Sequence, residues 1–460
     1  MKAKIICYLL CALLGLHLLL SGCGEDRWAA YATQTATDRW IDDTMRVWYY
    51  WAQDIPESKR LNYFQAPATF FKSLLSKEDR FSSIDSLFST SATRTIASPE
   101  YSYGMEFNVA TVEGNYMAHV LYTVEGSPAD EAGLKRGDWI MALNGEPLTK
   151  SNYTALLGGP AVEIVVGRYV AEQEAIVAYD EVPRQLPAAR RVEDNPVYCV
   201  KAFDLNGLRV GYLAYNHFTP GTAYRANGAG STTNYDDDLR LASAQLAAAN
   251  VSEMILDLRY NNGGYISCAQ LLATLLAPVS ALDAPMAYLE YNAKHQPVEM
   301  RLDKTLIGQG KNLDLKRLYV LTSSQTASAS EMVMNCLAPY MEVIQIGTTT
   351  VGKNMGARSF DNEEQMVTMT PMICKIYNAL NESDYAKGFS PTSPALKIDE
   401  NNYLGHFLPL GDPNETLLST ALATIAGESE SEPTTRQLTN HSITPLATSL
   451  SRRATAALLK

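Results

Sequence analysis

The stretch LYVLTSSQTASASEMVMNCLAPYMEVIQI, residues 318–346, decides the fold of the central part of the chain. Its apolar runs Leu318–Thr322 and Met341–Ile346 have the length of buried strands, and Ser328–Ala338 between them has helical spacing. Two strands joined by one helix form a βαβ unit, which implies a parallel sheet and a right-handed crossover. The sequence therefore predicts an α/β core.

The same alternation precedes this stretch. Leu208–Tyr215 and Ser252–Leu258 are predicted strands, and Tyr235–Ala249 and Ile266–Leu276 are predicted helices. Together with the βαβ unit, they indicate a core over residues 190–427 that is built on a parallel or mixed sheet with crossover helices.

Three loops of this core follow the carboxyl ends of predicted strands, where parallel sheets gather their binding sites. They are Asn261–Gly264, Ser323–Glu331 and Thr348–Asn354. The last two loops flank one crossover helix, so we expect their strands to be neighbours. A serine and a lysine are therefore expected at one edge of the sheet.

Serine needs a base, because its hydroxyl is a weak nucleophile at neutral pH. A lysine amine is a base only when neutral, which requires its pKa to fall from about 10.4 toward the operating pH. Lys353 has no acidic residue within seven positions on either side, and burial would lower its pKa. A histidine base is less favoured, since no histidine lies near either loop in the sequence.

Acyl transfer also needs hydrogen-bond donors for an oxyanion. The helix that begins near Ser328 offers the amide of Ala329, and Gly263 and Gly264 allow a second backbone N–H to approach. Each feature alone has a simpler explanation. A serine at a helix start is usually a cap, a Gly-Gly pair is usually a turn, and a loop lysine is usually solvated.

Residues 100–185 have a different pattern. Tyr103–Phe107 opens a strand, Gly126–Leu134 predicts a short helix with a glycine stop, and Arg136–Gly145 predicts a strand with an Asn-Gly hairpin turn. This succession resembles a PDZ domain of the bacterial protease type. The resemblance implies that Tyr103, Gly104 and Met105 form the loop that holds a peptide carboxylate. The alternative is a PDZ fold that serves only as a spacer.

The two ends of the chain have their own signals. Apolar residues at helical spacing from Asp38 onward, and again around Phe70, predict a small helical cap over residues 27–95. After Gly427 the composition turns to Glu, Ser, Thr and Pro, so we expect residues 428–460 to be a poorly ordered tail.

Residues 1–22 are predicted to be a targeting segment. Lys2 and Lys4 precede an apolar run that is too short to span a bilayer, and Leu20-Ser21-Gly22-Cys23 follows. This ending resembles a bacterial lipobox, which implies a lipoprotein signal peptide and lipidation of Cys23. The chain is then expected in the cell envelope, lipid-anchored at the outer membrane on its periplasmic or surface face. A plain signal peptide with a chance cysteine is the alternative.

Composition excludes other classes. The chain has 50 acidic and 38 basic residues, a formal net charge of −12, which is not the electrostatic footprint of a nucleic-acid binder. No cysteine pair has CxxC spacing and the six histidines never fall at metal-ligand spacing. We therefore expect no metal site and no cofactor. The cysteines at 199, 268, 336 and 374 have apolar neighbours and are predicted to be core thiols.

Over residues 38–427 the chain resembles the carboxy-terminal processing peptidases, or tail-specific proteases. The resemblance rests on the helical cap, the PDZ pattern, the glycine loop, Ser-Ala-Ser-Glu and Val-Gly-Lys. It implies that Ser328 is the nucleophile and that Lys353, 25 residues later, is the base. Ser324 and Ser330 do not have this spacing. The implied oxyanion donors are Ala329 and the Gly263–Gly264 turn.

Domain order and the glycine loop are most similar to the lipoprotein branch of Bacteroides-type bacteria. One departure is Ala357, where many members carry a glutamine that orients the lysine. The resemblance implies a lipid-anchored serine endopeptidase with a Ser–Lys dyad, whose PDZ domain captures proteins by an apolar C-terminus. The alternatives are a catalytically silent peptide-binding scaffold lipoprotein and hydrolysis of a non-peptide ester. Substrate and oligomeric state stay open.

Overall fold

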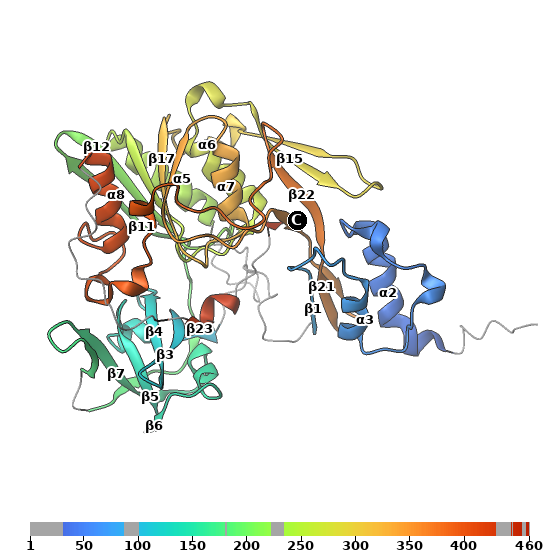
Figure 1. Ribbon diagram of the computed structural model, residues 1–460, viewed down its shortest axis with the longest axis horizontal. Helices are drawn as coiled ribbons and strands as arrows, with labels where there is room; N and C mark the ends of the chain where they lie inside the picture. The colour runs from blue at the N-terminus through green and yellow to red at the C-terminus, as the bar shows by residue number, and fades with distance from the viewer. Residues whose placement is uncertain are drawn as a thin grey trace, which may run out of the picture.

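A computed structural model describes residues 31–86, 101–179, 182–221, 234–428, 443, 445–452 and 457–459. The predicted signal peptide and Cys23 lie outside the described residues. Figure 1 shows the α/β core with a β-rich domain below it and the N-terminal helical region, drawn in blue, beside it. In the part of the chain that is described, no helix has both the length and the apolar character needed to cross a bilayer.

The central sheet of the core has five strands. Their order is β11 (Val197–Leu205), β12 (Leu208–Tyr215), β13 (Glu253–Asp257), β17 (Arg317–Thr322) and β18 (Glu342–Gly347). The hairpin β11–β12 is antiparallel, whereas β12, β13, β17 and β18 run parallel. Helix α7 (Ala329–Leu337) joins β17 to β18, which confirms the predicted βαβ unit and the α/β class.

Helices cover both faces of this sheet. Alternate residues of each strand point to opposite faces, and in β13 and β17 both sets are apolar, so each face must be covered. On one face, Leu256 and Val320 pack with residues of α5 (Tyr235–Ala248), α6 (Ile266–Leu276) and α7. On the other face, Ile255 and Leu321 pack against α8 (Thr416–Ala426). Figure 1 shows α8 and α5–α7 on opposite sides of the sheet.

A second sheet lies beside α6 and α7 and was not predicted from the sequence. Its six strands follow the order β14 (Gly264–Tyr265), β24 (Ala457–Leu458), β19 (Met355–Ala357), β22 (Met372–Asn378), β15 (Pro285–Tyr291) and β16 (Val298–Arg301). Strand β14 directly follows the glycine loop, and β19 begins two residues after Lys353. This sheet therefore extends from both predicted catalytic loops.

The PDZ region forms a sheet in the order β23 (Pro445–Thr448), β3 (Met105–Val112), β4 (Asn115–Thr123), β5 (Trp139–Leu143), β7 (Val162–Val170) and β8 (Ala175–Ala178). Two further strands, β6 (Glu146–Pro147) and β9 (Arg184–Leu186), pair with β5 and β7. The short helix α4 (Pro128–Glu131) begins after the cap Ser127, whose Oγ accepts from the Asp130 N–H. The two-residue turn between β5 and β6 is Asn144-Gly145, with both φ angles positive, as the Asn-Gly signal predicted.

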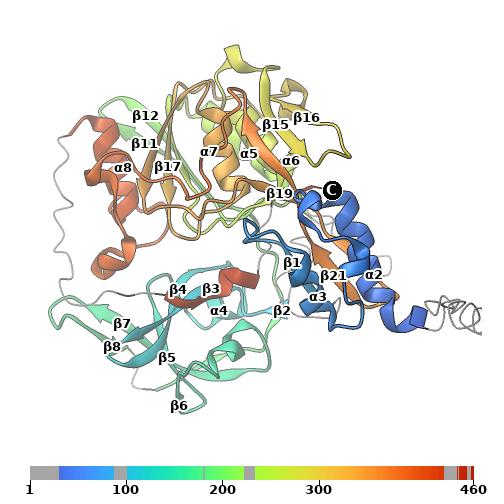
Figure 2. The same ribbon diagram turned by 45° about the vertical axis from the view of Figure 1, so that its right-hand side comes forward.

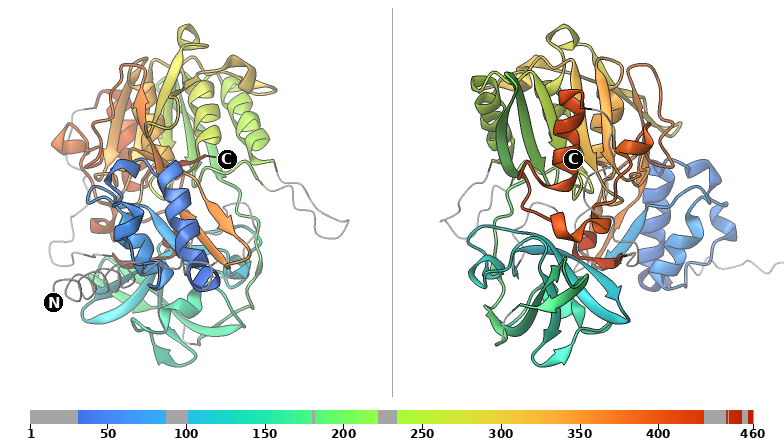
Figure 3. Two further views of the ribbon diagram at one scale, coloured as in Figure 1. Left: turned by 90° about the vertical axis from the view of Figure 1, so that its right-hand side faces the viewer. Right: turned by 60° about the vertical axis from the view of Figure 1, so that its left-hand side comes forward.

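The N-terminal helices are α2 (Ala32–Trp48) and α3 (Pro67–Leu74), which share an apolar cluster that includes Met45 and Phe70. After them, β1 (Ser83–Ser86) pairs with β21 (Val367–Thr370), which in turn pairs with β20 (Phe360–Asn362). Figures 2 and 3 show the blue helices lying against these strands. The helical cap is thus joined to the core by a shared sheet.

The expectation of a poorly ordered tail after residue 427 is wrong for residues 445–452 and 457–459. Strand β23 adds to the edge of β3, and β24 lies between β14 and β19. The physical reason is that strand addition uses backbone N–H and C=O groups, which every non-proline residue carries. A polar composition therefore does not prevent it.

Candidate active site

Ser328 stands at the turn between β17 and α7, completely buried, with φ 62° and ψ −112°. A non-glycine residue in this region carries strain of order 1–3 kcal/mol, which the surrounding contacts must sustain. Its N–H donates to Glu331 Oε2 at 2.8 Å. Its Oγ has no hydrogen-bond partner among the described residues. The hydroxyl is therefore held in place by the backbone and is not committed to another group.

Glu331 connects the serine turn to the lysine loop. Its Oε2 accepts the backbone N–H of Ser328 and that of Lys353, each at 2.8 Å. Its Oε1 accepts the Gly352 N–H at 2.6 Å and the Thr350 Oγ1 at 2.5 Å. Burial raises the pKa of this carboxyl, and these four hydrogen bonds oppose the rise. One carboxylate thus fixes the predicted nucleophile and the predicted base in one frame.

This role of Glu331 was not predicted from the sequence, where the residue was considered only as part of the Ser-Ala-Ser-Glu segment. A signal was present, because a serine at a helix start followed three residues later by glutamate is a capping pattern. That pattern predicts the hydrogen bond to the Ser328 N–H. It does not predict the three hydrogen bonds from the lysine loop.

Lys353 is buried, as the predicted role of a base requires, and burial lowers its pKa to about 7. The charges of Asp79 and Glu331 act in the opposite direction but are outweighed. The Lys353 Nζ lies 4.8 Å from the centroid of the Phe81 ring. An amine with this pKa is substantially neutral at physiological pH and can accept a proton.

The N-terminal segment supplies part of the lysine environment. Arg80 Nη2 donates to the carbonyl oxygens of Gly352 at 3.2 Å and Ala386 at 2.7 Å. Asp79 Oδ1 accepts the backbone N–H groups of Phe81 and Ser82, both at 2.9 Å. The two Arg80 contacts join residues 272 and 306 positions apart and could not be read from the sequence, which predicted only a cap with its own core.

The glycine loop lies against the serine. A Cβ built on Gly263 would stand 2.8 Å from Ser328 Cβ and 3.2 Å from the Ala329 nitrogen, so only glycine fits here at φ 110°. The Asn261 carbonyl accepts the Ala327 N–H at 3.1 Å and the Ser330 Oγ at 2.9 Å. The structure therefore brings together Ser328, Ala329 and the Gly263–Gly264 turn.

The three predicted oxyanion donors differ in their hydrogen bonding. The Gly263 N–H donates to Asn261 Oδ1 at 3.0 Å. Gly264 belongs to β14 and pairs with Ala457 of β24. Ala329 is the first residue of α7, where backbone N–H groups have no partner within the helix. Of the three predicted donors, the Ala329 N–H is therefore the one best placed to donate a hydrogen bond to an oxyanion.

The other candidate nucleophiles are less suited to this role. The Ser330 hydroxyl donates to the Asn261 carbonyl, and Ser324 is exposed. Cys268, Cys336 and Cys374 are buried free thiols, as predicted, whereas Cys199, predicted with them, is only half-buried. Burial raises the pKa of Cys374 to about 12. Ala357, in place of the family's glutamine, is buried in β19, and its methyl group offers no hydrogen bond to the lysine.

The predicted carboxylate loop stands at the start of β3. Gly104 has φ 73°, and a Cβ there would fall 2.1 Å from Ser127 Cβ, so glycine is required. The Gly104 N–H donates to Ser102 Oγ at 3.1 Å, and Tyr103 is buried with its hydroxyl donating to Pro160 O at 2.6 Å. The structure thus places Tyr103, Gly104 and Met105 together, apart from the catalytic loops, and peptide binding there stays a prediction.

A buried charge cluster lies where the PDZ region meets the core. Arg259 contacts Glu400 at 2.7 Å and Glu415 at 2.6 Å, and Arg136 contacts Glu400 at 2.7 Å. Arg259 also pairs with Asp257 at 2.9 Å. Burial alone would raise the pKa of Glu400, but Arg136 and Arg259 outweigh it and lower that pKa to about 2. The cluster thus sets two guanidinium groups against three carboxylates, and two of its members, Asp257 and Arg259, directly precede the glycine loop.

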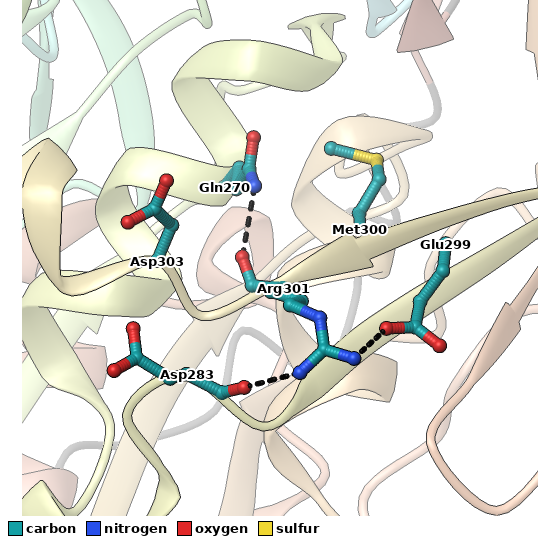
Figure 4. A pocket seen from close by; sticks show the side chains of 6 residues that line it. All are labelled: Gln270, Asp283, Glu299, Met300, Arg301 and Asp303. Atoms are coloured by element: carbon teal, nitrogen blue, oxygen red, sulfur yellow. Dashed lines mark hydrogen bonds and ion pairs between the residues drawn. The ribbon is translucent and has the colours of Figure 1, made fainter.

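A surface pocket lies apart from these residues, between α6 and the β15–β16 hairpin. Its polar groups bind one another: Arg301 contacts Glu299 at 2.6 Å and the Asp283 carbonyl at 2.9 Å, while Gln270 donates to the Arg301 carbonyl at 2.8 Å (Figure 4). Asp303 and Met300 complete the lining. It contains neither the serine nor the lysine. Among the described residues, no cluster of His, Cys, Asp and Glu is arranged to hold a metal ion.

Comparison with known proteins agrees with this arrangement. The profile of Peptidase family S41 matches residues 209–392, that of the Peptidase S41 N-terminal domain matches 36–83, and a PDZ profile matches 119–166. A crystal structure from Bacteroides fragilis NCTC 9343 assigned to the S41 proteases is 38% identical, with a TM-score of 0.74. The alignment covers 84% of this chain and 97% of that one.

Curated relatives include the chloroplastic carboxyl-terminal-processing peptidase 1 of Arabidopsis thaliana, 29% identical over 53% of this chain and 45% of that protein. The carboxyl-terminal-processing protease of Synechocystis is 27% identical over 55% of this chain and 52% of that protein. The chain thus spans about half the length of these relatives. The fold and site define an α/β peptidase with a PDZ domain. The chain belongs to peptidase family S41, among homologues named carboxyl-terminal-processing proteases.

Proposed function

We propose that this protein is a serine endopeptidase that uses Ser328 and Lys353 as a catalytic dyad. The observation that carries the proposal is the Glu331 carboxylate, whose single oxygen accepts the backbone N–H of both residues at 2.8 Å. The second support is the burial of Lys353, which lowers its pKa to about 7. A neutral amine and an uncommitted hydroxyl in one rigid frame are the requirements for this chemistry.

In the proposed reaction, the neutral Lys353 Nζ takes the proton of the Ser328 hydroxyl as Oγ attacks the scissile carbonyl carbon. The Ala329 N–H and a second N–H from the Gly263–Gly264 turn stabilise the oxyanion. When the tetrahedral intermediate collapses, the Lys353 ammonium gives its proton to the leaving amine. Water, deprotonated by Lys353, then hydrolyses the acyl-enzyme and restores both groups.

Substrates are proposed to be proteins or peptides with an apolar C-terminus. The support is the loop at Tyr103–Met105, followed by strand β3, whose edge pairs with the added strand β23 in this structure and could pair with a peptide in its place. Backbone N–H groups around this loop would bind the terminal carboxylate. The PDZ domain would then deliver the bound chain to Ser328.

We further propose that Cys23 is lipidated and that the enzyme is anchored in the cell envelope. The support is the Leu-Ser-Gly-Cys sequence after a short apolar segment. Replacement of Cys23 by alanine should release the protein from the membrane fraction and abolish fatty-acid labelling. Continued labelling of the variant would contradict the assignment.

The test of the activity is to incubate the protein with matched peptides that have a free or an amidated apolar C-terminus, and to identify products by mass spectrometry. Amidation removes a charge, and hydrogen bonds to charged groups contribute roughly 1.5–3 kcal/mol. We expect a KM about ten- to a hundredfold higher for the amidated peptide, with kcat unchanged. No cleavage of any peptide would favour a silent scaffold, and equal KM values would make the PDZ domain a spacer.

A further inference from the structure

Residues 445–452 and 457–459 lie along the path that the proposed function assigns to substrates. We name the described residues 445–452 and 457–459 the tail. We propose that the tail is a displaceable peptide ligand of its own chain, bound in cis to the strand edges that protein substrates would use. This inference rests on the proposed function, because it concerns the occupancy of the same site.

The first contact is with the PDZ region. Strand β23 of the tail pairs antiparallel with β3, with Ala447 opposite Val109 and Thr448 opposite Asn108. The tail therefore runs toward the start of β3, where the loop at Tyr103–Met105 stands. A peptide whose carboxylate was held by that loop would run along the same edge in the same direction. Figure 1 shows β23 beside β3.

Side chains reinforce this pairing. The Phe107 N–H donates to Ser449 Oγ at 2.8 Å, and Arg452 Nη2 lies 3.2 Å from Glu106 Oε1. Arg452 Nη1 also donates to the Leu157 carbonyl at 2.9 Å. The tail thus engages the first residues of β3 through polar contacts, without an unpaired buried charge at these positions.

The second contact is at the junction with the core. Leu450 is completely buried in an apolar cluster that contains Leu121 and Tyr122 of the PDZ region and Tyr260 of the core. Its carbonyl accepts from Asn262 Nδ2 at 2.9 Å. Asn262 directly precedes the Gly263–Gly264 turn. The tail therefore passes from the PDZ edge to the glycine loop.

The third contact is inside the proposed catalytic site. Strand β24 lies parallel to β14 and to β19, with Ala457 opposite Gly264 on one side and Gly356 on the other. The Leu459 N–H donates to the Ala357 carbonyl at 2.9 Å. A substrate that pairs with the glycine loop as an extended strand competes for these backbone groups. The tail and a substrate cannot occupy them together.

The pairing at each end is short, four residues in β23 and two in β24. Such short strands make few backbone hydrogen bonds, so a free peptide of this sequence is expected to bind weakly and the tether to the rest of the chain to favour its binding. A tethered ligand experiences an effective concentration on the order of millimolar. A segment whose free peptide binds with a Kd of about 100 μM would then raise the apparent KM for substrates about tenfold.

The test compares the full chain with a chain that ends after Thr444, using a short peptide substrate. We expect the shortened chain to have a KM about tenfold lower and an unchanged kcat, because the two forms differ in competition for the site. A synthetic peptide of residues 444–460 should restore the higher KM when it is added to the shortened chain. An unchanged KM in a folded shortened chain would overturn the inference.

Two point variants keep the test available if shortening impairs folding. Leu450→Asp places a charge in the buried cluster and should lower KM as shortening does. Leu446→Asp is the matched control, because the Leu446 side chain is 56% exposed, and its KM should equal that of the unmodified chain. Thermal unfolding of each variant confirms that it is folded. Equal KM values for both variants would contradict a displaceable tail.

A binding measurement separates this inference from the proposed function. The labelled 444–460 peptide should bind to the shortened chain carrying Ser328→Ala and not to the full chain carrying Ser328→Ala. This measurement requires no catalysis. If no form cleaves peptides but the label binds only the shortened chain, the proposed function fails and the tail assignment stands. Equal binding to both chains would show that the tail does not occupy the site.

Discussion

Two buried cationic side chains in this protein, Lys353 and Arg259, have opposite electrostatic surroundings. Burial would lower the pKa of both. For Arg259, the carboxylates of Asp257, Glu415 and Glu400 outweigh burial and raise the pKa further. For Lys353, Asp79 and Glu331 do not outweigh it, and the pKa falls to about 7.

The difference shows how one fold raises the pKa of one buried basic side chain and lowers that of another. Glu331 is near the lysine loop, but its oxygens accept backbone N–H groups and a threonine hydroxyl. The carboxylates around Arg259 instead bind the guanidinium itself. The pKa of each buried cation therefore depends on whether the nearby carboxylates hydrogen-bond to backbone N–H groups or to the cation itself.

The largest expected effect follows from removal of either dyad member. Ser328→Ala and Lys353→Ala should each lower kcat for peptide cleavage by at least about 10³-fold, and the double variant should be no slower. Lys353→Arg should be equally inactive, because a guanidinium does not give up its proton. Steady-state kinetics check this, with the exposed Lys316→Ala as control. A double variant much slower than either single one would argue against a dyad.

Stability should change in opposite senses at the two cations. Arg259→Met leaves the buried Asp257 carboxylate without a cation and leaves Glu400 and Glu415 with Arg136 alone, so it should cost about 3–5 kcal/mol of unfolding free energy. Lys353→Met removes a poorly compensated buried charge and should cost little or stabilise the fold. Equilibrium urea unfolding at pH 7 measures both. A similar loss of unfolding free energy in the two variants would contradict the proposed difference between the surroundings of Arg259 and Lys353.

The stability difference between the unmodified protein and Lys353→Met should depend on pH, and the lowered pKa of Lys353 determines the sign of this dependence. Between pH about 7 and about 10.4, the unfolded chain holds a proton on Lys353 that the folded chain has lost, so the stability of the unmodified protein should rise with pH. Lys353→Met lacks this contribution. The stability difference between the two proteins should therefore shift in favour of the unmodified chain as pH increases through this window.

A smaller effect is expected from the carboxylate that holds the two loops. Glu331→Gln replaces one acceptor oxygen by an N–H₂ group, which cannot accept the N–H groups now bound there. We expect kcat to fall about a hundredfold with KM nearly unchanged, because the residue positions Ser328 and Lys353 and does not touch substrate. Glu331→Asp should not restore the rate. A change confined to KM would contradict this role.

The smallest expected effect concerns Phe81, whose ring lies beside the Lys353 amine. With Lys353 as the base, kcat/KM should rise with pH through about 7. Phe81→Ala admits water to Nζ, so the pKa of Lys353 should rise and this limb should move to higher pH. A shift of about one pH unit lowers activity about tenfold at pH 6. Phe64→Ala, at a ring that is 56% exposed, is the control and should leave the profile in place.

Much of the α/β core was predictable, because it depends on patterns within about 30 residues. The apolar runs around Ser328 and Lys353 fixed strands, helix and loop order, and parallel pairing then placed both residues at one sheet edge. The tail strands and the contacts of Asp79, Arg80 and Phe81 were not predictable, because they join distant segments through backbone groups or single side chains. No local periodicity records such contacts.

Strand β24 has a consequence for when the site can form during synthesis. The six-stranded sheet places Ala457 between Gly264 and Gly356, so its order is complete only after residue 458 has left the ribosome. Residues 79–81, which lie beside Lys353, are synthesised much earlier and cannot form their contacts until residues 352 and 353 have been made. Contacts between such distant segments form slowly. A chain that is still being synthesised therefore carries Ser328 and Lys353 without the finished sheet around them.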